Sequence, residues 1–144
     1  HRIENAPVQT AHALLHPNHP ERGTRDLVFS GELYISAADI TGHDMIRLKD
    51  LFNVRISQDE GIFLLSYAGD SLDEARAVKA PIVQWLPSGE VQPCILRKPD
   101  GNVNGLCEPA AASEIGKVVQ FERVGFARID AVEDGILQAY YAHR

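Results

Sequence analysis

The sequence has no apolar run that approaches the length of a membrane span, and its start shows no signal-peptide pattern. It contains only two cysteines, Cys94 and Cys107, and their spacing matches no metal-binding motif. Both stand among apolar residues, so we expect buried free thiols in a cytoplasmic protein rather than a disulfide. Internal repeats and low-complexity stretches are also lacking. These absences argue against a membrane protein and against a repeat protein.

No catalytic set can be recognised in the sequence. It has no Ser/His/Asp motif, no glycine-rich loop before a helix and no paired acids in a familiar frame. The PDG at 99–101 indicates a turn, and the GDS at 69–71 indicates a loop followed by a helix N-cap. We therefore expect no catalytic residue and favour a binding domain over an enzyme.

Positive charge is scarce, with 14 Lys and Arg against 20 Asp and Glu and a net charge of -6. Because phosphate binding needs a basic surface, this balance counts against general nucleic-acid affinity. An acidic protein can still bind a nucleic acid if its basic residues gather on one face. The basic residues that fall on polar faces or ends of predicted strands are Arg47, Lys49, Arg55, Arg97, Lys98, Lys117, Arg123 and Arg128. They predict either a basic stripe or ordinary solvated strand faces that discourage edge pairing.

Hydrophobic residues make up 44% of the 144 residues, enough for a core in one domain or in two small barrels. Most of the chain consists of short strand-like segments separated by glycine and proline turn signals. These segments are 27–30, 32–36, 45–49, 52–56, 61–68, 81–87, 91–98, 117–123, 124–130 and 135–144. The strongly apolar 61–68 predicts a strand that is buried on both faces or lies at a barrel crossing. The fold class is therefore all-β, as barrels or a sandwich.

One helix is predicted, at 71–80, because Ser71 and Glu74 form a capping-box pattern and Pro81 ends the segment. A soft domain boundary falls at 69–81.

Residues 1–25 are rich in proline, histidine and asparagine, and they predict a structured loop or edge crossing. His16 and His19 have the spacing of a metal pair, with His12 nearby, but no carboxylate stands at a familiar interval. We therefore favour a loop with imidazoles hydrogen-bonded to backbone over a metal site.

Five segments carry a resemblance to a known family: HPNHPERGTR, SGELYIS followed by Asp39, IRLKDLFNVRI, IVQWLP and VVQFERVGFARID. In this order, from about residue 14 to 130, they resemble the C-terminal anticodon-binding region of the glutaminyl- and archaeal-type glutamyl-tRNA synthetases of class I. QFER at 120–123 is the most specific of them. The resemblance implies two packed β-barrels, proximal and distal, of a ribosomal-protein-like kind with short helical connections. Residues 1–80 would begin the proximal barrel, 81–112 would form the distal segment, and 113–144 would return to complete the proximal barrel.

The resemblance also implies residue roles. The Gln and Arg of QFER in the family contact the middle anticodon base, a uridine, and these positions match Gln120 and Arg123. A uracil edge offers two acceptors and one donor, which suits an amide and a guanidinium. Arg47 and Lys49 match a basic strand near the third base, and Arg55 matches a position just after it. The expected RNA-binding set is Gln120, Arg123, Arg47, Lys49, Arg55, Arg97, Lys98 and Arg128.

Gln120 and Arg123 are three residues apart, so a regular strand would point them to opposite faces. We therefore predict irregular backbone within 120–126, with Gly125 permitting a tight turn. Phe121 is expected to anchor the segment in the core, and Glu122 to pair with a nearby arginine.

The resemblance implies that the chain recognises the anticodon loop of tRNA(Glu), and tRNA(Gln) is a further candidate. It would do so as a module of a ligase that charges tRNA with glutamate. ATP and Mg²⁺ would bind an upstream catalytic domain, so neither a cofactor nor catalysis is expected here. The first residue is His, which we interpret as the start of a fragment. Short connections around 87–105 and an end at YAHR that looks natural favour the glutamyl enzyme. The expected partners are the tRNA anticodon stem-loop and the upstream domains of the same chain, without DNA or membrane.

We further expect a monomer in the cytoplasm. Three alternatives remain: the anticodon-binding domain of a glutaminyl-tRNA synthetase, a β-barrel protein-interaction domain, and a small metal-binding domain built on the histidines.

Overall fold

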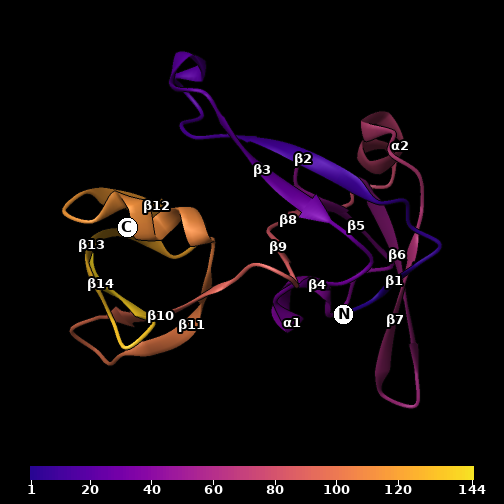
Figure 1. Cartoon of the computed structure of the whole chain (residues 1–144). Helices are drawn as coiled ribbons and strands as arrows, with labels where there is room; N and C mark the ends of the chain where they lie inside the picture. Colours follow the sequence, from indigo (N-terminus) through magenta and orange to yellow (C-terminus); the bar gives the residue numbers. More distant parts are fainter. The chain divides into compact units, whose positions relative to one another are not determined.

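The computed structural model describes residues 1–144 and divides them into two compact units, His1–Ser88 and Gly89–Arg144 (Figure 1). Each unit has a five-stranded sheet and a buried core of its own. The fold is mostly β, in agreement with the all-β prediction at this coarser level. Neither five-stranded sheet closes into a barrel, and the boundary between the units lies after the predicted one. The longest helices have six residues, and none is long and apolar enough to cross a membrane.

The sheet of the first unit has the strand order β1-β7-β6-β5-β8. Its strands are β1 (Ile3–Glu4), β5 (Met45–Leu48), β6 (Asn53–Asp59), β7 (Ile62–Tyr67) and β8 (Ile82–Val83). Two further strand pairs join β2 (Gln9–Leu14) to β3 (Thr24–Phe29) and β4 (Leu33–Tyr34) to β9 (Leu86–Pro87). The short helices are η1 (Pro20–Arg22), α1 (Ala37–Ile40) and α2 (Leu72–Ala77).

The core of the first unit follows from the alternation of β5 and β6. Ile46 and Leu48 are fully buried, as their period of two predicts. Beside them, the ring of Phe29 meets that of Phe52 edge to face, with 5.2 Å between centroids. The indole Nε1 of Trp85 donates to the backbone oxygen of Lys49 at 3.0 Å, which ties the end of β5 to the chain that leads into β9.

The helix predicted at 71–80 is confirmed as α2. The hydroxyl oxygen of its N-cap Ser71 accepts a hydrogen bond from the Glu74 backbone N–H at 3.3 Å, as the capping pattern requires. The short α1 and the 3-10 helices η1 and η2 (Pro109–Glu114) were not predicted.

The prediction that 61–68 is buried on both faces is wrong. In β7, Ile62 is 65% exposed and Leu64 is 49% exposed, whereas Leu65 on the other face is buried. The β6–β7 hairpin extends beyond the rest of the sheet (Figure 1), so nothing covers its tip. An apolar run alone does not reveal which faces of a strand other elements cover.

The prediction of a loop throughout 1–25 is also wrong, because β1 and β2 lie there. Ala11 and Ala13 of β2 are buried and alternate with polar residues, but two alanines give a weak apolar signal. The β2–β3 hairpin carries η1 near its tip (Figure 1).

The predicted pairing of the histidines with backbone holds for His16 alone. Its Nδ1 accepts from the Asn18 N–H at 3.2 Å. The Nδ1 atoms of His12 and His19 instead contact the carboxylates of Asp26 at 2.6 Å and Glu21 at 2.8 Å. Nowhere do three His, Cys, Asp or Glu side chains gather in an arrangement that could hold a metal ion.

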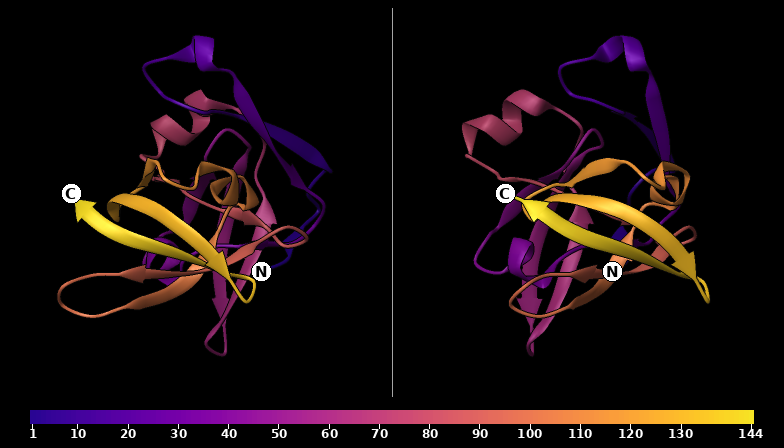
Figure 2. Two further views of the ribbon diagram at one scale, coloured as in Figure 1. Left: turned by 60° about the vertical axis from the view of Figure 1, so that its left-hand side comes forward. Right: turned by 90° about the vertical axis from the view of Figure 1, so that its left-hand side faces the viewer.

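The second unit has the strand order β11-β10-β14-β13-β12. Its strands are β10 (Gln92–Arg97), β11 (Val103–Cys107), β12 (Val118–Phe121), β13 (Gly125–Glu133) and β14 (Ile136–His143). The β10–β14 pair is parallel and the others are antiparallel. Figure 2 shows β13 and β14 side by side as the long ribbons nearest the C-terminus. Residues 113–144 thus share a sheet with the preceding strands in one compact unit, a division that differs from the expected return to the first barrel.

Both cysteines are free, as expected. Cys94 lies opposite Gly105, and Cys107 lies two residues further along β11, so the two thiols are diagonal neighbours on one face of the sheet. Cys107 is buried and Cys94 is half-buried. The hydrogen bond from the Cys107 thiol lowers the pKa of Cys94 to about 7, and the same contact raises the pKa of Cys107.

Candidate nucleic-acid interface

A tight turn joins β12 to β13 and carries the QFER segment. Gln120 pairs with Phe126 and Phe121 with Gly125, which leaves Glu122, Arg123 and Val124 in the turn. The Val124 N–H donates to the Phe121 oxygen at 2.9 Å. Arg123 has φ 64 and Gly125 has φ 140, so the irregular backbone predicted within 120–126 is confirmed.

The turn resolves the conflict between spacing and strand alternation. Gln120 still belongs to β12 and is exposed, whereas Arg123 has left the strand and is exposed in the turn. Phe121, between them, is half-buried and packs against the core of the second unit, as predicted. Gln120 and Arg123 are therefore both exposed at one end of the hairpin.

Gly125 fixes the position of this turn against β14. A Cβ atom at Gly125 would lie 2.7 Å from Cε2 of Tyr141 and 2.8 Å from the backbone oxygen of His143. Real Cβ atoms do not approach other atoms so closely, so only glycine lets the two backbones come together here.

The outer face of the second sheet, defined as the face opposite its core, carries two more predicted residues. Arg97 of β10 and Arg128 of β13 both lie opposite Tyr140 of β14. Arg97 Nη2 donates to the Gln138 side-chain oxygen at 2.8 Å, and Arg128 Nη2 to Asp130 Oδ1 at 2.9 Å.

Lys98 has a different environment. Its ammonium lies 5.4 Å from the centre of the Tyr141 ring, which packs against the core, and 3.9 Å from Asp100 Oδ1. Its side chain is only 29% exposed. Lys98 therefore borders the core face rather than the outer face that carries Arg97.

The remaining predicted residues lie in the first unit. Arg55 of β6 is exposed, opposite Met45. Lys49, just after β5, is half-buried. The Nη1 atom of Arg47 donates to Asn53 Oδ1 at 3.0 Å and to the Asp70 backbone oxygen at 2.9 Å. Arg47 thus holds the loop before α2 in place, and whatever contact it makes with a ligand must use its other N–H groups.

Sequence reasoning missed Asn53, Gln138 and Tyr140. Asn53 and Gln138 are the two buried polar side chains of the protein, and each accepts a hydrogen bond from a predicted arginine. Alternation marks both as polar-face residues, but it gives no sign that they are buried. Tyr140 stands two residues from Gln138 on the last strand, which places it on the same face.

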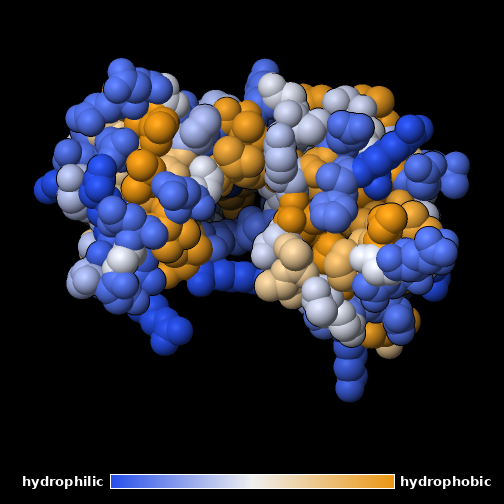
Figure 3. All heavy atoms as spheres, turned by 90° about the horizontal axis from the view of Figure 1, so that it is seen from below, coloured by the Kyte–Doolittle hydropathy of each residue, from blue (hydrophilic) through white to orange (hydrophobic).

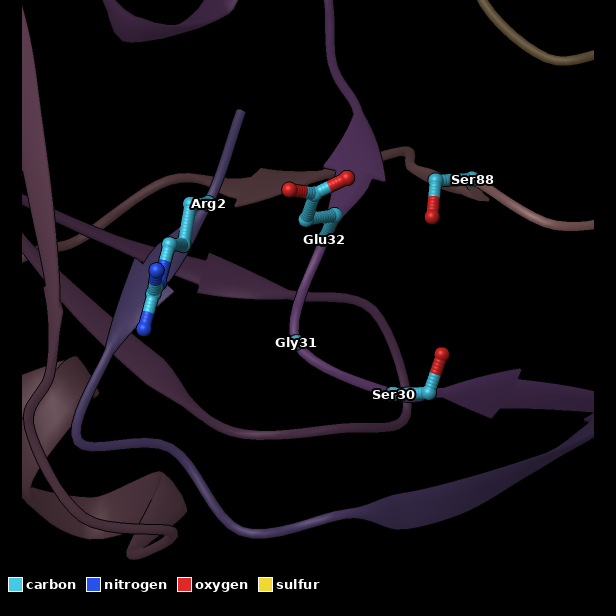
Figure 4. Close-up of a pocket in the computed structure, with 5 residues that line it drawn as sticks. All are labelled: Arg2, Ser30, Gly31, Glu32 and Ser88. Atoms are coloured by element: carbon cyan, nitrogen blue, oxygen red, sulfur yellow. The ribbon is translucent and has the colours of Figure 1, made fainter.

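A shallow hollow in the first unit is lined by Arg2, Ser30, Gly31, Glu32 and Ser88 (Figure 4). It has no apolar wall of the kind that buries a small ligand. In Figure 3 hydrophilic and hydrophobic residues both appear on the surface of each unit. We assign no ligand to this hollow.

Comparisons with known proteins identify matches along most of the chain. A family profile described as "tRNA synthetases class I (E and Q), anti-codon binding domain" matches residues 1–64, and a second profile with the same description matches residues 82–130. The chain is 54% identical over 142 residues to the glutamate-tRNA ligase of Methanoculleus marisnigri, and 50% identical over 142 residues to that of Methanocorpusculum labreanum. It is 49% identical over 143 residues to that of Methanospirillum hungatei.

Each of these alignments covers 99% of the chain and 25% of the relative. The chain therefore spans about a quarter of the length of the curated relatives it matches. The first profile lies within the first unit, whereas the second begins at residue 82, near the end of the first unit, and continues into the second unit. The chain belongs to the anticodon-binding domain family of the class I glutamyl- and glutaminyl-tRNA synthetases.

Proposed function

We propose that this chain recognises the anticodon loop of tRNA(Glu), as the C-terminal module of a ligase that uses ATP to charge tRNA with glutamate. The observation that carries the proposal is the β12–β13 turn, which presents Gln120 and Arg123 on an anchored hairpin inside the segment matched at 82–130. The relatives' name, glutamate-tRNA ligase, supports glutamate as the amino acid. ATP and Mg²⁺ belong to the catalytic part of such a ligase, and no residue of this chain is assigned to them.

In this proposal Gln120 and Arg123 read the middle base, a uridine. Sequence-specific RNA recognition targets loop bases that are unstacked and whose edges are open. The Gln120 amide can donate to a uracil carbonyl and accept from its ring N–H, while Arg123 donates to a carbonyl from a planar fork. Because the turn is anchored by Phe121 and Gly125, the two groups need little ordering on binding.

Six cations complete the proposed RNA-binding set: Arg47, Lys49, Arg55, Arg97, Lys98 and Arg128. With a net charge of -6, affinity for phosphates must come from a few local cations rather than from the whole surface. The exposed Arg55 is well placed for such a contact, whereas Arg47 acts mainly through the loop that it holds.

We further propose that the protein works in the cytoplasm, and that its upstream partner is the catalytic part of the same ligase. The alternative of a protein-interaction domain is favoured only by the acidic net charge.

Arg123→Ala is expected to lower discrimination between an anticodon stem-loop with a central U and one with another middle base. The expected loss is about 5- to 150-fold, or about 1–3 kcal/mol, the scale of a good bidentate contact to a base. Binding of both RNAs can be measured by fluorescence anisotropy. Lys79→Ala is the matched control, because Lys79 is also an exposed cation with a left-handed backbone, φ 55. Equal affinity of the unaltered chain for the two RNAs would refute base readout.

Lys49→Ala is expected to weaken binding to every stem-loop about equally. Because one phosphate contact is lost, the slope of log K against log salt should fall by about one unit. Titrations at several salt concentrations measure both effects. A change in preference for the middle base would contradict a phosphate role for Lys49, and an unchanged preference in Arg123→Ala would contradict the role given to Arg123.

A further inference from the structure

Tyr140 lies on the outer face of the second sheet with an arginine on either side. Its Cα partners are Arg97 on β10 and Arg128 on β13, so three side chains line up across three neighbouring strands. Paired residues of adjacent strands share a face, and the neighbouring row of Leu96, Ala139 and Ile129 is buried in the core. The row of Tyr140 therefore faces away from the core.

The tyrosine ring is accessible and its neighbours are held in place. Tyr140 is 42% exposed, and the guanidinium carbon of Arg128 lies 5.8 Å from the centre of its ring. Arg97 is fixed by its hydrogen bond to Gln138, whose side chain is buried and whose amide nitrogen also contacts the Ile136 oxygen at 3.4 Å. Such restraint lowers the entropy that binding would otherwise cost.

A second aromatic pair connects this row to the QFER turn. Phe126 pairs with Gln120 on one side and with His143 on the other. The rings of Phe126 and His143 are stacked, with centroids 4.7 Å apart and planes 29° apart. The outer face thus runs from Gln120, across two stacked rings, to the row that holds Tyr140.

The chemistry of the row favours a base over a phosphate. Arg128 already pairs with the Asp130 carboxylate at 2.9 Å, which offsets part of the positive charge. An aromatic ring flanked by guanidinium planes offers stacking surface to any base, because every base has a π face. An acidic protein segment would gain little from a cation that is already paired.

We propose that Tyr140, between Arg97 and Arg128, is a stacking platform for an unpaired base of the tRNA next to the base contacted by Gln120 and Arg123. This inference rests on the proposed function and adds to it a residue that strengthens binding without choosing the base. Tyr140 supplies the ring, the guanidinium of Arg128 lies over it, Arg97 stands beside it on the next strand, and Gln138 holds Arg97 in position.

The test uses anticodon stem-loops in which 2-aminopurine replaces each unpaired loop base in turn, because stacking on an aromatic ring quenches its fluorescence. The unaltered chain and Tyr140→Phe should quench one position, and Tyr140→Leu should not. Tyr140→Leu should also bind about 5- to 150-fold more weakly, the range for loss of one base stack. Tyr34→Leu is the matched control, since Tyr34 is a 45% exposed tyrosine on β4 of the first unit.

Two outcomes would overturn the platform: unchanged quenching and affinity in Tyr140→Leu, or a loss of middle-base discrimination as large as the loss of affinity. Tyr140→Ile, which introduces a β-branched residue of high strand propensity, serves if the leucine variant does not fold. Failure of the proposed function is recognised separately, because the unaltered chain would then bind stem-loops with different middle bases equally.

Discussion

Gly125→Ala is expected to destabilise the second unit by about 3 kcal/mol or more, because Gly125 is the glycine of this chain at which an added Cβ would meet the closest contacts. The new Cβ would meet the Tyr141 ring at 2.7 Å and the His143 backbone oxygen at 2.8 Å. The backbone at φ 140 is a conformation that L residues rarely adopt. Neither atom is the free end of a flexible chain, so β14 or the turn must move. Urea denaturation followed by circular dichroism measures the loss.

Gly116→Ala is the matched control in the same unit. Gly116 has φ 84, but a Cβ there would meet nothing within 4 Å. Its substitution carries only the backbone penalty, about 1–2 kcal/mol. If the two variants lose the same stability, close approach to β14 is not what selects glycine at Gly125. If Gly125→Ala folds, the shifted turn should also reduce tRNA binding.

Asn53→Leu is expected to destabilise the first unit by about 2–4 kcal/mol. Asn53 is fully buried. Its Nδ2 donates to the backbone oxygen of Ser71 at 2.8 Å, and its Oδ1 accepts from Arg47 Nη1 at 3.0 Å. Leucine has a similar volume but leaves a carbonyl and a guanidinium without this partner, and each unsatisfied group costs about 1–3 kcal/mol. Thermal and urea unfolding of the variant measure the effect.

Gln58→Leu provides the comparison, because Gln58 is an exposed amide on the same strand, β6. Its substitution should change stability by no more than about 0.5 kcal/mol. Equal effects at the two positions would show that the buried amide does not hold the loop before α2. Asn53→Asp separates the two hydrogen bonds, since a carboxylate can accept from Arg47 but cannot donate to Ser71.

Strand positions were largely predictable, because period-two alternation and glycine or proline turns mark most of them. The exceptions have weak side-chain signals: β2 buries Ala11 and Ala13, and β11 contains Gly105. What the sequence could not reveal is which faces are covered. Leu64 and Leu65 are identical residues side by side, and only the fold decides that one is exposed and the other buried.

The candidate site was predictable where local geometry constrains it. Gln120 and Arg123 cannot share a face of a regular strand, and from this the turn could be inferred before it was seen. The row of Arg97, Tyr140 and Arg128 could not be, because it depends on the parallel pairing of β10 with β14. Parallel pairing joins segments far apart in the chain, and no local pattern encodes its register.

The place of β14 in the middle of the second sheet also determines the order in which this unit can be assembled during synthesis. The β10–β11 and β12–β13 hairpins are local and can form as the nascent chain leaves the ribosome. Each then presents an unpaired strand edge, and the two edges are joined only when β14 is inserted between them. A released chain truncated before residue 136 therefore has two hairpins with open edges and an uncovered apolar face, which is the state in which aggregation and proteolysis compete with folding.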